Sequence, residues 1–161
     1  MLTRPSPRRI LRPLVTLVAF VVVASANVSR AGEVPATARE QLATAKYVYI
    51  SSTRKDGSLS KPAEIWFMSH NGAVYVGTPP TSWRARRIKA GRPQAKIWVG
   101  KPDGPSFTAT GAVVKDPALE TLMLETYAKK YPDGWPKYEQ KFRSGFADGS
   151  RIVIKYTPTG N

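Results

Sequence analysis

The residues best suited to chemistry in this chain lie in one short stretch, where hydroxyl and guanidinium side chains follow a strand-like segment. Thr78 and Ser82 come shortly before Arg84, Arg86 and Arg87. Arginine offers paired N–H donors that match phosphate oxygens, and a helix starting near Ser82 would add backbone N–H groups with positive partial charge. The stretch therefore predicts a phosphate-binding turn. The alternative is that the three arginines form the solvated face of a basic helix, and residue types alone leave both interpretations open.

Two local elements would hold these side chains in place. Residues 74–76, Val-Tyr-Val, alternate as a strand does, and Gly77 with the prolines behind it ends that strand. Thr81 or Ser82 can cap the following helix by accepting from the N–H groups of its first turn. Gly91 then ends the helix. The sequence thus predicts a strand, a hydroxyl-rich turn and a short basic helix in succession.

Other kinds of reactive site are excluded by composition. The chain has no cysteine, so no disulfide, thiol nucleophile or thiolate metal site can form. It has one histidine, His70, which excludes metal sites built from several histidines. His70 precedes an Asn-Gly pair, and we expect it to be a solvated turn residue. The sequence predicts no metal site, and it leaves the catalytic residues unknown.

The N-terminal segment has the features of a secretory signal peptide. Residues 1–14 contain four arginines and no acidic residue, residues 14–24 are apolar, and Ala24-Ser25-Ala26 fits a small-residue cleavage pattern. We therefore expect residues 1–26 to be removed and the protein to be periplasmic or secreted. A retained anchor is the alternative, although the apolar run is short for a bilayer span. Arg8-Arg9 can also be read as part of a twin-arginine signal.

The remaining chain is basic and of a length that suits one domain. The 161 residues carry a net charge of +14, and removal of four arginines with the signal leaves +10 over 135 residues. Such a charge favours anionic partners, namely phosphate groups, nucleic acid or an anionic membrane surface. Because export would separate the protein from nucleic acid, we expect no nucleic-acid partner. Contact with a membrane is expected only if the N-terminal segment is retained.

The rest of the chain alternates between strand and helix signals. Residues 27–41 look like an extended leader running into a short helix. Asp56-Gly57 and Asn71-Gly72 are hairpin turns. Six segments have strand patterns: 47–52, 62–68, 73–78, 95–99, 106–115 and 151–156. Helices are expected over 37–45, capped by Thr37, and over 82–90, 116–130 and 138–146. Hairpin links favour an antiparallel sheet, which can close as a small barrel in a mainly β (α+β) protein.

Several motifs in this order are similar to those of one known family. Ile65-Trp66-Phe67-Met68 looks like a strand whose backbone edges a flavin ring, and Thr78 followed by Ser82-Trp83-Arg84 looks like a strand-end threonine with a Ser-Arg-Lys signature. With the closing strand, they resemble the pyridoxamine 5′-phosphate oxidase-like family over residues 42–158. The resemblance implies a six-stranded antiparallel split β-barrel of Greek-key topology with flanking helices. It makes residues 42–161 an FMN-binding domain.

The resemblance also implies roles for individual residues. Thr78, Ser82 and Arg84 would bind the phosphate of FMN. Trp83 stands where the family often has arginine and Arg84 where it often has lysine, and Arg86 or Arg87 can replace the missing charge. The isoalloxazine ring would face the backbone of four residues: Ile65, Trp66, Phe67 and Met68.

Two classes of function follow from the resemblance. The first is an FMN-dependent oxidoreductase that acts on a small molecule, and a homodimer is expected because barrels of this type usually place FMN between two subunits. The second is a non-catalytic binding module that holds haem, a deazaflavin or another anionic ligand. The sequence does not identify the substrate.

Overall fold

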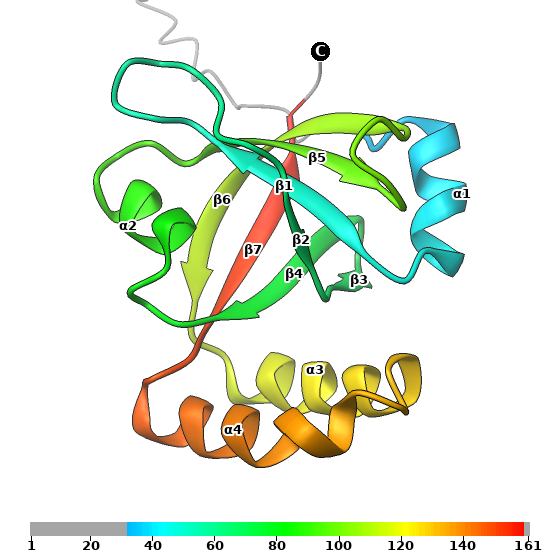
Figure 1. Ribbon diagram of the computed structural model, residues 1–161, viewed down its shortest axis with the longest axis vertical. Helices are drawn as coiled ribbons and strands as arrows, with labels where there is room; N and C mark the ends of the chain where they lie inside the picture. Colours follow the sequence, from blue (N-terminus) through cyan, green and yellow to red (C-terminus); the bar gives the residue numbers. More distant parts are fainter. Residues whose placement is uncertain (1–31, 160–161) are drawn as a thin grey trace, which may run out of the picture.

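The computed structural model describes residues 32–159, so the predicted signal peptide lies outside the described residues. A curled antiparallel sheet forms the body of the molecule, with α3 and α4 packed together at one end of it (Figure 1). The strands are β1 (Val48–Ser52), β2 (Ala63–Ile65), β3 (Met68–His70), β4 (Ala73–Thr78), β5 (Gln94–Val99), β6 (Ser106–Val114) and β7 (Ile152–Pro158). The helices are α1 (Ala36–Thr44), α2 (Trp83–Lys89), α3 (Pro117–Lys130) and α4 (Trp135–Asp148). The predicted mainly β, antiparallel barrel fold is confirmed.

The two edges of the sheet are consecutive in the chain. The strand order is β2-β1-β5-β6-β7-β4-β3, with antiparallel neighbours throughout. Only Trp66 and Phe67 separate β2 from β3, so the sheet must curl until its edges approach each other, as a split barrel does.

The prediction of one strand over residues 62–68 is therefore wrong, and the sheet has seven strands where six were expected. Ile65 pairs with Val48 of β1, whereas Met68 pairs with Tyr75 of β4. One straight strand cannot pair with both ends of the curled sheet, so the strand is interrupted at Trp66 and Phe67.

Tyr127 of α3 and Tyr131, the C-cap residue of that helix, satisfy the backbone where the strand is interrupted. The register of β3 and β4, continued by two residues, would place Trp66 opposite Gly77. The Tyr127 hydroxyl lies there instead, accepting from the Gly77 N–H at 3.4 Å and donating to the Trp66 carbonyl at 2.9 Å. The Tyr131 hydroxyl likewise accepts from the Phe67 N–H at 2.9 Å and donates to the Phe67 carbonyl at 3.3 Å. Burial raises the pKa of both tyrosines, so both keep the proton they donate.

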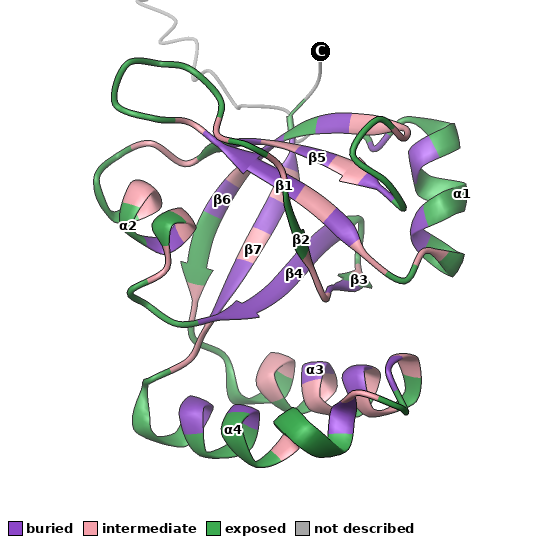
Figure 2. Cartoon of the chain, in the orientation of Figure 1, coloured by how far each residue is buried: buried purple, intermediate pink, exposed green. Residues whose placement is uncertain are grey.

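Two hydrophobic clusters hold the fold together, and β4 belongs to both. All six of its residues are buried (Figure 2). Val74 and Val76 pack inside the barrel, whereas Ala73 and Tyr75 pack against α3 and α4. Since successive strand residues face opposite sides of a sheet, apolar cover on both sides explains why residues 73–76 of β4 are all hydrophobic. The strand then ends in Gly77 and the buried, polar Thr78.

Local signals set most element boundaries. The Asp116 carboxylate caps α3 by accepting from the Ala118 and Leu119 N–H groups. The N-cap of α1 is Pro35, and the expected cap by Thr37 is wrong. Helix α4 begins at Trp135, before the expected residue 138, because the following proline lies in the first turn, where no N–H partner is lost. Within residues 32–159, no helix is both long and apolar enough to cross a membrane.

Candidate functional site

The predicted strand–turn–helix unit is present. Strand β4 ends at the buried Thr78, and the helix that follows is capped by Ser82, whose Oγ accepts from the Ala85 N–H at 3.3 Å. Gly91, with φ of +74°, follows the end of the helix. Helix α2 has only seven residues, and one of its free N–H groups is occupied by the cap. The positive charge of this region therefore comes mainly from its side chains.

These side chains border a cavity of about 470 Å³, which we call the basic cavity. It lies between α2 and the β1–β2 hairpin. Its lining contains four cationic side chains and no acidic one. The lining residues are Ile50, Ser52, Arg54, Ser60, Lys61, Ala63, Thr78, Ser82, Trp83, Arg84 and Arg87.

Arg84 is the most informative of these residues. It is partly buried, and loss of water from its guanidinium lowers the pKa, an effect partly opposed by the phenol oxygens of Tyr156 and Tyr127. Among residues 32–159, no carboxylate forms a salt bridge with it. A guanidinium that has lost water without gaining a counter-ion is unfavourable. An anion in the cavity would supply the missing partner.

Arg87 connects α2 to the barrel. Its Nη1 donates to Ser52 Oγ at 2.6 Å and to the Ser52 carbonyl at 3.4 Å, and Ser52 is buried in β1. This contact fixes one wall of the basic cavity. Arg86 is exposed and does not line the cavity.

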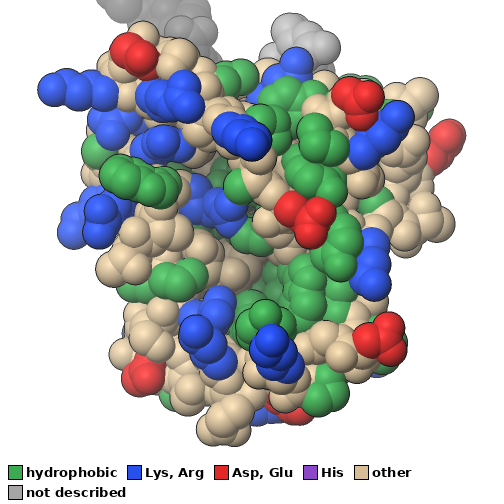
Figure 3. Space-filling model, in the orientation of Figure 1, with side chains coloured by type: hydrophobic (Ala, Val, Ile, Leu, Met, Phe, Trp, Pro, Cys, Tyr) green, Lys and Arg blue, Asp and Glu red, His purple; other side chains and the backbone are tan. Residues whose placement is uncertain are grey.

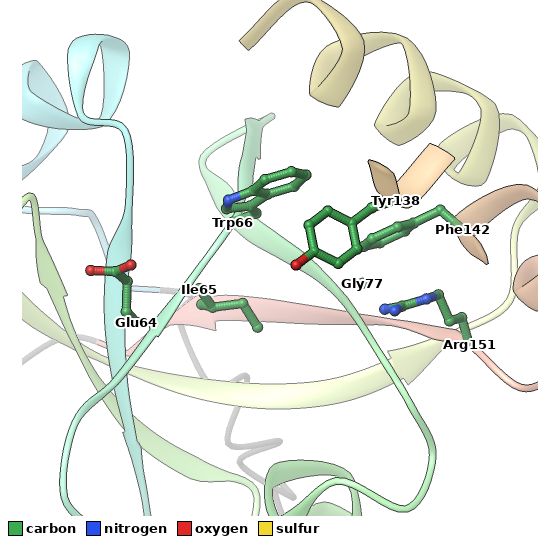
Figure 4. Close-up of a pocket in the computed structure, with 7 residues that line it drawn as sticks. All are labelled: Glu64, Ile65, Trp66, Gly77, Tyr138, Phe142 and Arg151. Atoms are coloured by element: carbon green, nitrogen blue, oxygen red, sulfur yellow. The ribbon is translucent and has the colours of Figure 1, made fainter. Parts of the chain in front are cut away.

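A second cavity, of about 320 Å³, has three aromatic rings in its lining, and we call it the aromatic cavity (Figure 4). It is lined by Glu64, Ile65, Trp66, Gly77, Tyr138, Phe142 and Arg151. The Trp66 ring stacks on the Tyr131 ring, with centroids 4.2 Å apart and planes at 6°. It also makes an edge-to-face contact with the Tyr138 ring, with centroids 5.5 Å apart. Gly77 must be glycine here, because an added Cβ would lie 2.6 Å from the Phe142 ring.

Arg151 brings a cation into the aromatic cavity. Its guanidinium lies 3.9 Å from the centroid of the Phe142 ring and points toward the interior of the cavity (Figure 4). Burial lowers the pKa of Arg151, and its Nε is buried without a hydrogen-bond partner in the described part of the chain. Arg151 therefore places a positive charge in the wall of the aromatic cavity.

The two cavities adjoin. Consecutive residues of β2, Ala63 and Glu64, line the basic and the aromatic cavity respectively, and so do Thr78 and Gly77 at the end of β4. The face of the molecule shown in Figure 3 is hollowed near its centre. Lys and Arg side chains gather on the α2 side of the hollow, and hydrophobic side chains lie across from them. The arrangement can hold a ligand that has an anionic end and a planar, mostly apolar end.

The predicted site residues divide into three groups. Thr78, Ser82, Trp83, Arg84 and Arg87 come together around the basic cavity. Ile65 and Trp66 line the aromatic cavity. Phe67, Met68 and Arg86 line neither, since the first two are buried in the hydrophobic clusters and Arg86 points to solvent.

Sequence reasoning did not identify the wall of the basic cavity opposite α2. That wall includes Ser52, Arg54, Ser60 and Lys61, which come from β1 and the hairpin that follows it. The one local signal is the basic turn at Arg54. Its position opposite α2 results from the pairing of β1 with β2 and β5, which no local pattern encodes.

Ser82→Ala should lower the stability of the protein moderately. The substitution removes the hydroxyl that caps α2, and loss of such a cap costs about 0.5–2 kcal/mol. Urea unfolding followed by circular dichroism measures the change. Thr81→Ala is the matched control, because Thr81 is exposed and is not the N-cap. Equal effects of the two substitutions would contradict the assigned cap.

Comparison with known proteins identifies solved structures that share this fold. Models of protein families gave no match, and neither did a search of curated proteins. Solved structures do match. A protein related to general stress protein 26, of the pyridoxinephosphate oxidase family, from Clostridium acetobutylicum has a TM-score of 0.52 at 15% identity, covering 74% of this chain and 80% of that one. The chain has the pyridoxamine 5′-phosphate oxidase-like split-barrel fold.

Other proteins with this split-barrel fold have different described roles. An F420 reductase is 20% identical, with a TM-score of 0.52 over 79% of this chain and 97% of its own. HutZ, the haem storage protein of Vibrio cholerae, is 11% identical, with a TM-score of 0.57 over 80% of this chain and 92% of its own. At these identities the likeness establishes the split barrel and does not select one ligand.

Proposed function

We propose that this chain binds a phosphorylated flavin, FMN in the simplest case, and acts as a flavin-dependent oxidoreductase on a small molecule. The observation that carries the proposal is Arg84. It is a partly buried guanidinium without a carboxylate partner in the described chain, and it faces a basic cavity that adjoins an aromatic one.

The residues present fit such a cofactor at both ends. Thr78 and Ser82 offer hydroxyl groups and Arg84 a charged fork for a phosphate, which suits charge-assisted hydrogen bonding. Ile65 and Trp66 would lie beside the planar ring. Each cavity falls within the roughly 300–1,000 Å³ typical of ligand sites. When bound, a flavin supplies hydride or electron transfer, and the protein orients it and limits access of water.

Haem is less well supported than flavin. The chain has one histidine, His70. It lies at the end of β3, 6.2 Å from the Tyr75 ring, and it lines neither cavity. Neither cavity therefore presents an imidazole to a haem iron. A deazaflavin remains the second candidate, because it shares the planar ring and the anionic end and because an F420 reductase has this fold.

The absorption spectrum of purified protein tests the proposal. Two bands, in the near-ultraviolet and the blue, are expected for an oxidised flavin, and mass spectrometry of the released ligand separates FMN from a deazaflavin. Protein purified without ligand should bind added FMN more tightly than riboflavin, because riboflavin lacks the phosphate. A Soret band, or equal affinity for FMN and riboflavin, would reject the proposal.

We also propose that two copies of the chain form a homodimer around the ligand, as the resemblance implies. The face of the molecule shown in Figure 3 is hollowed near its centre, so a second subunit is a suitable cover for a ligand bound there. Analytical ultracentrifugation of the flavin-loaded protein is expected to give a dimer at micromolar concentration. A monomer with flavin bound would contradict this prediction.

Export is the third part of the proposal, and it rests on the N-terminal sequence alone. The protein is expected in the periplasm or medium with a new N-terminus near residue 27. Sequencing of the exported protein checks this, and an intact Met1 would favour a retained anchor.

A further inference from the structure

The charge of the basic cavity exceeds the charge of a single phosphate monoester. Arg54 and Lys61 approach from the β1–β2 hairpin, and Arg84 and Arg87 from α2. Within residues 32–159 none of these four cations forms a salt bridge. A phosphate monoester carries only about −1.5 to −2 at neutral pH. The four cations therefore match a ligand with a second anionic group.

The size of the basic cavity points the same way. Its volume is about 470 Å³, against about 320 Å³ for the aromatic cavity. A phosphate group is smaller than a fused ring system. The basic cavity therefore has space for more than one phosphate group.

Trp83 stands at the edge of this space. It lines the basic cavity, yet it is 70% exposed. The guanidinium carbons of Arg86 and Arg87 lie 5.5 and 5.8 Å from its ring centroid, and the high exposure means that they leave most of the ring open. An open indole beside cationic groups is a platform on which a planar base can stack.

We propose that the basic cavity accepts a ligand with two neighbouring phosphate groups and a planar base that stacks on Trp83. The chemical class is that of a nucleoside diphosphate, either free or as half of a dinucleotide flavin. This inference rests on the phosphate-binding part of the proposed function and not on the placement of a ring in the aromatic cavity. Arg84 would bind the first phosphate and Lys61, across the cavity, the second.

Calorimetric titrations with inorganic phosphate, pyrophosphate and ADP at one ionic strength test the two parts of the inference separately. Pyrophosphate against phosphate tests the second phosphate site, and ADP against pyrophosphate tests the stacking of the base on Trp83. Pyrophosphate should bind at least about tenfold more tightly than phosphate, since it adds a charge-assisted contact. Lys61→Ala should remove most of that difference. Trp83→Leu keeps an apolar side chain but removes the ring, so it should weaken ADP roughly fivefold or more and pyrophosphate less than about twofold.

Trp98→Leu is the matched control. Trp98 is a half-buried indole on β5 that lines neither cavity, so its loss should leave ADP affinity unchanged in protein that circular dichroism shows to be folded. Equal affinities for phosphate and pyrophosphate, or equal losses of affinity for ADP and pyrophosphate in Trp83→Leu, would overturn the inference.

The same titrations separate this inference from the proposed function. Tight FMN binding with no preference for pyrophosphate rejects only this inference, whereas tight ADP binding without flavin binding rejects only the flavin assignment.

Discussion

Arg84→Ala is expected to weaken FMN binding by roughly ten- to a hundredfold and to change riboflavin binding much less. Arg84 lines the basic cavity without a carboxylate partner in residues 32–159. A charge-assisted hydrogen bond to phosphate contributes about 1.5–3 kcal/mol, which corresponds to that loss of affinity. Titration of both flavins, followed by quenching of their fluorescence, gives the two changes directly.

Two further variants sharpen this experiment. Arg86→Ala removes the same charge from the same helix, but Arg86 is exposed and lies outside the cavity, so its effect should be small. Arg84→Lys should fall between wild type and Arg84→Ala, because lysine keeps the charge and loses the paired donors. If Arg84→Ala weakened FMN and riboflavin equally, the arginine would act through the fold and not through the phosphate.

Tyr127→Phe is expected to lower the free energy of unfolding by at least about 2 kcal/mol. The Tyr127 hydroxyl donates to the Trp66 carbonyl and accepts from the Gly77 N–H, and the Tyr127 side chain is fully buried. Phenylalanine fills the same space but leaves both backbone groups unpaired. Each buried group that loses its partner costs roughly 1–3 kcal/mol.

Urea unfolding of the ligand-free protein measures this effect. Tyr138→Phe is the control, since Tyr138 also contacts the Trp66 ring but is 38% exposed, with no hydrogen bond to the backbone of Trp66 or Gly77. A loss below about 0.5 kcal/mol in Tyr127→Phe would mean that the strand ends re-pair with each other when the hydroxyl is absent. In that case the tyrosine would not be what separates them.

The parts of this molecule that the sequence predicts well are those with local physical causes. Ser82 caps α2 because a hydroxyl can reach N–H groups three residues on. Asn71 and Gly72 turn between β3 and β4 with φ values of +47° and +72°, which few other residues adopt easily. The phosphate-binding hypothesis arose from the turn that ends at Ser82. Thr78, Ser82, Arg84 and Arg87 do gather around one cavity, whereas Arg86 lies outside it.

The parts that the sequence did not predict depend on distant contacts. Residues 62–68 look like one strand because their apolar pattern continues through Trp66 and Phe67. The backbone groups at the break are bonded by hydroxyl groups some sixty positions further on, those of Tyr127 and Tyr131. Lys61 enters the basic cavity for a similar reason, since the pairing of β2 with β1 places it opposite α2.

The position of β7 has a consequence for how the chain folds during synthesis. It is the last of the described strands to be made, yet it lies inside the sheet, between β6 and β4. Until it emerges from the ribosome, β2, β1, β5 and β6 can pair among themselves and β3 can pair with β4, but nothing joins the two groups within the sheet. Contacts this distant in sequence form slowly, and unpaired strand edges favour aggregation. The nascent chain is therefore most vulnerable just before residues 152–158 become available.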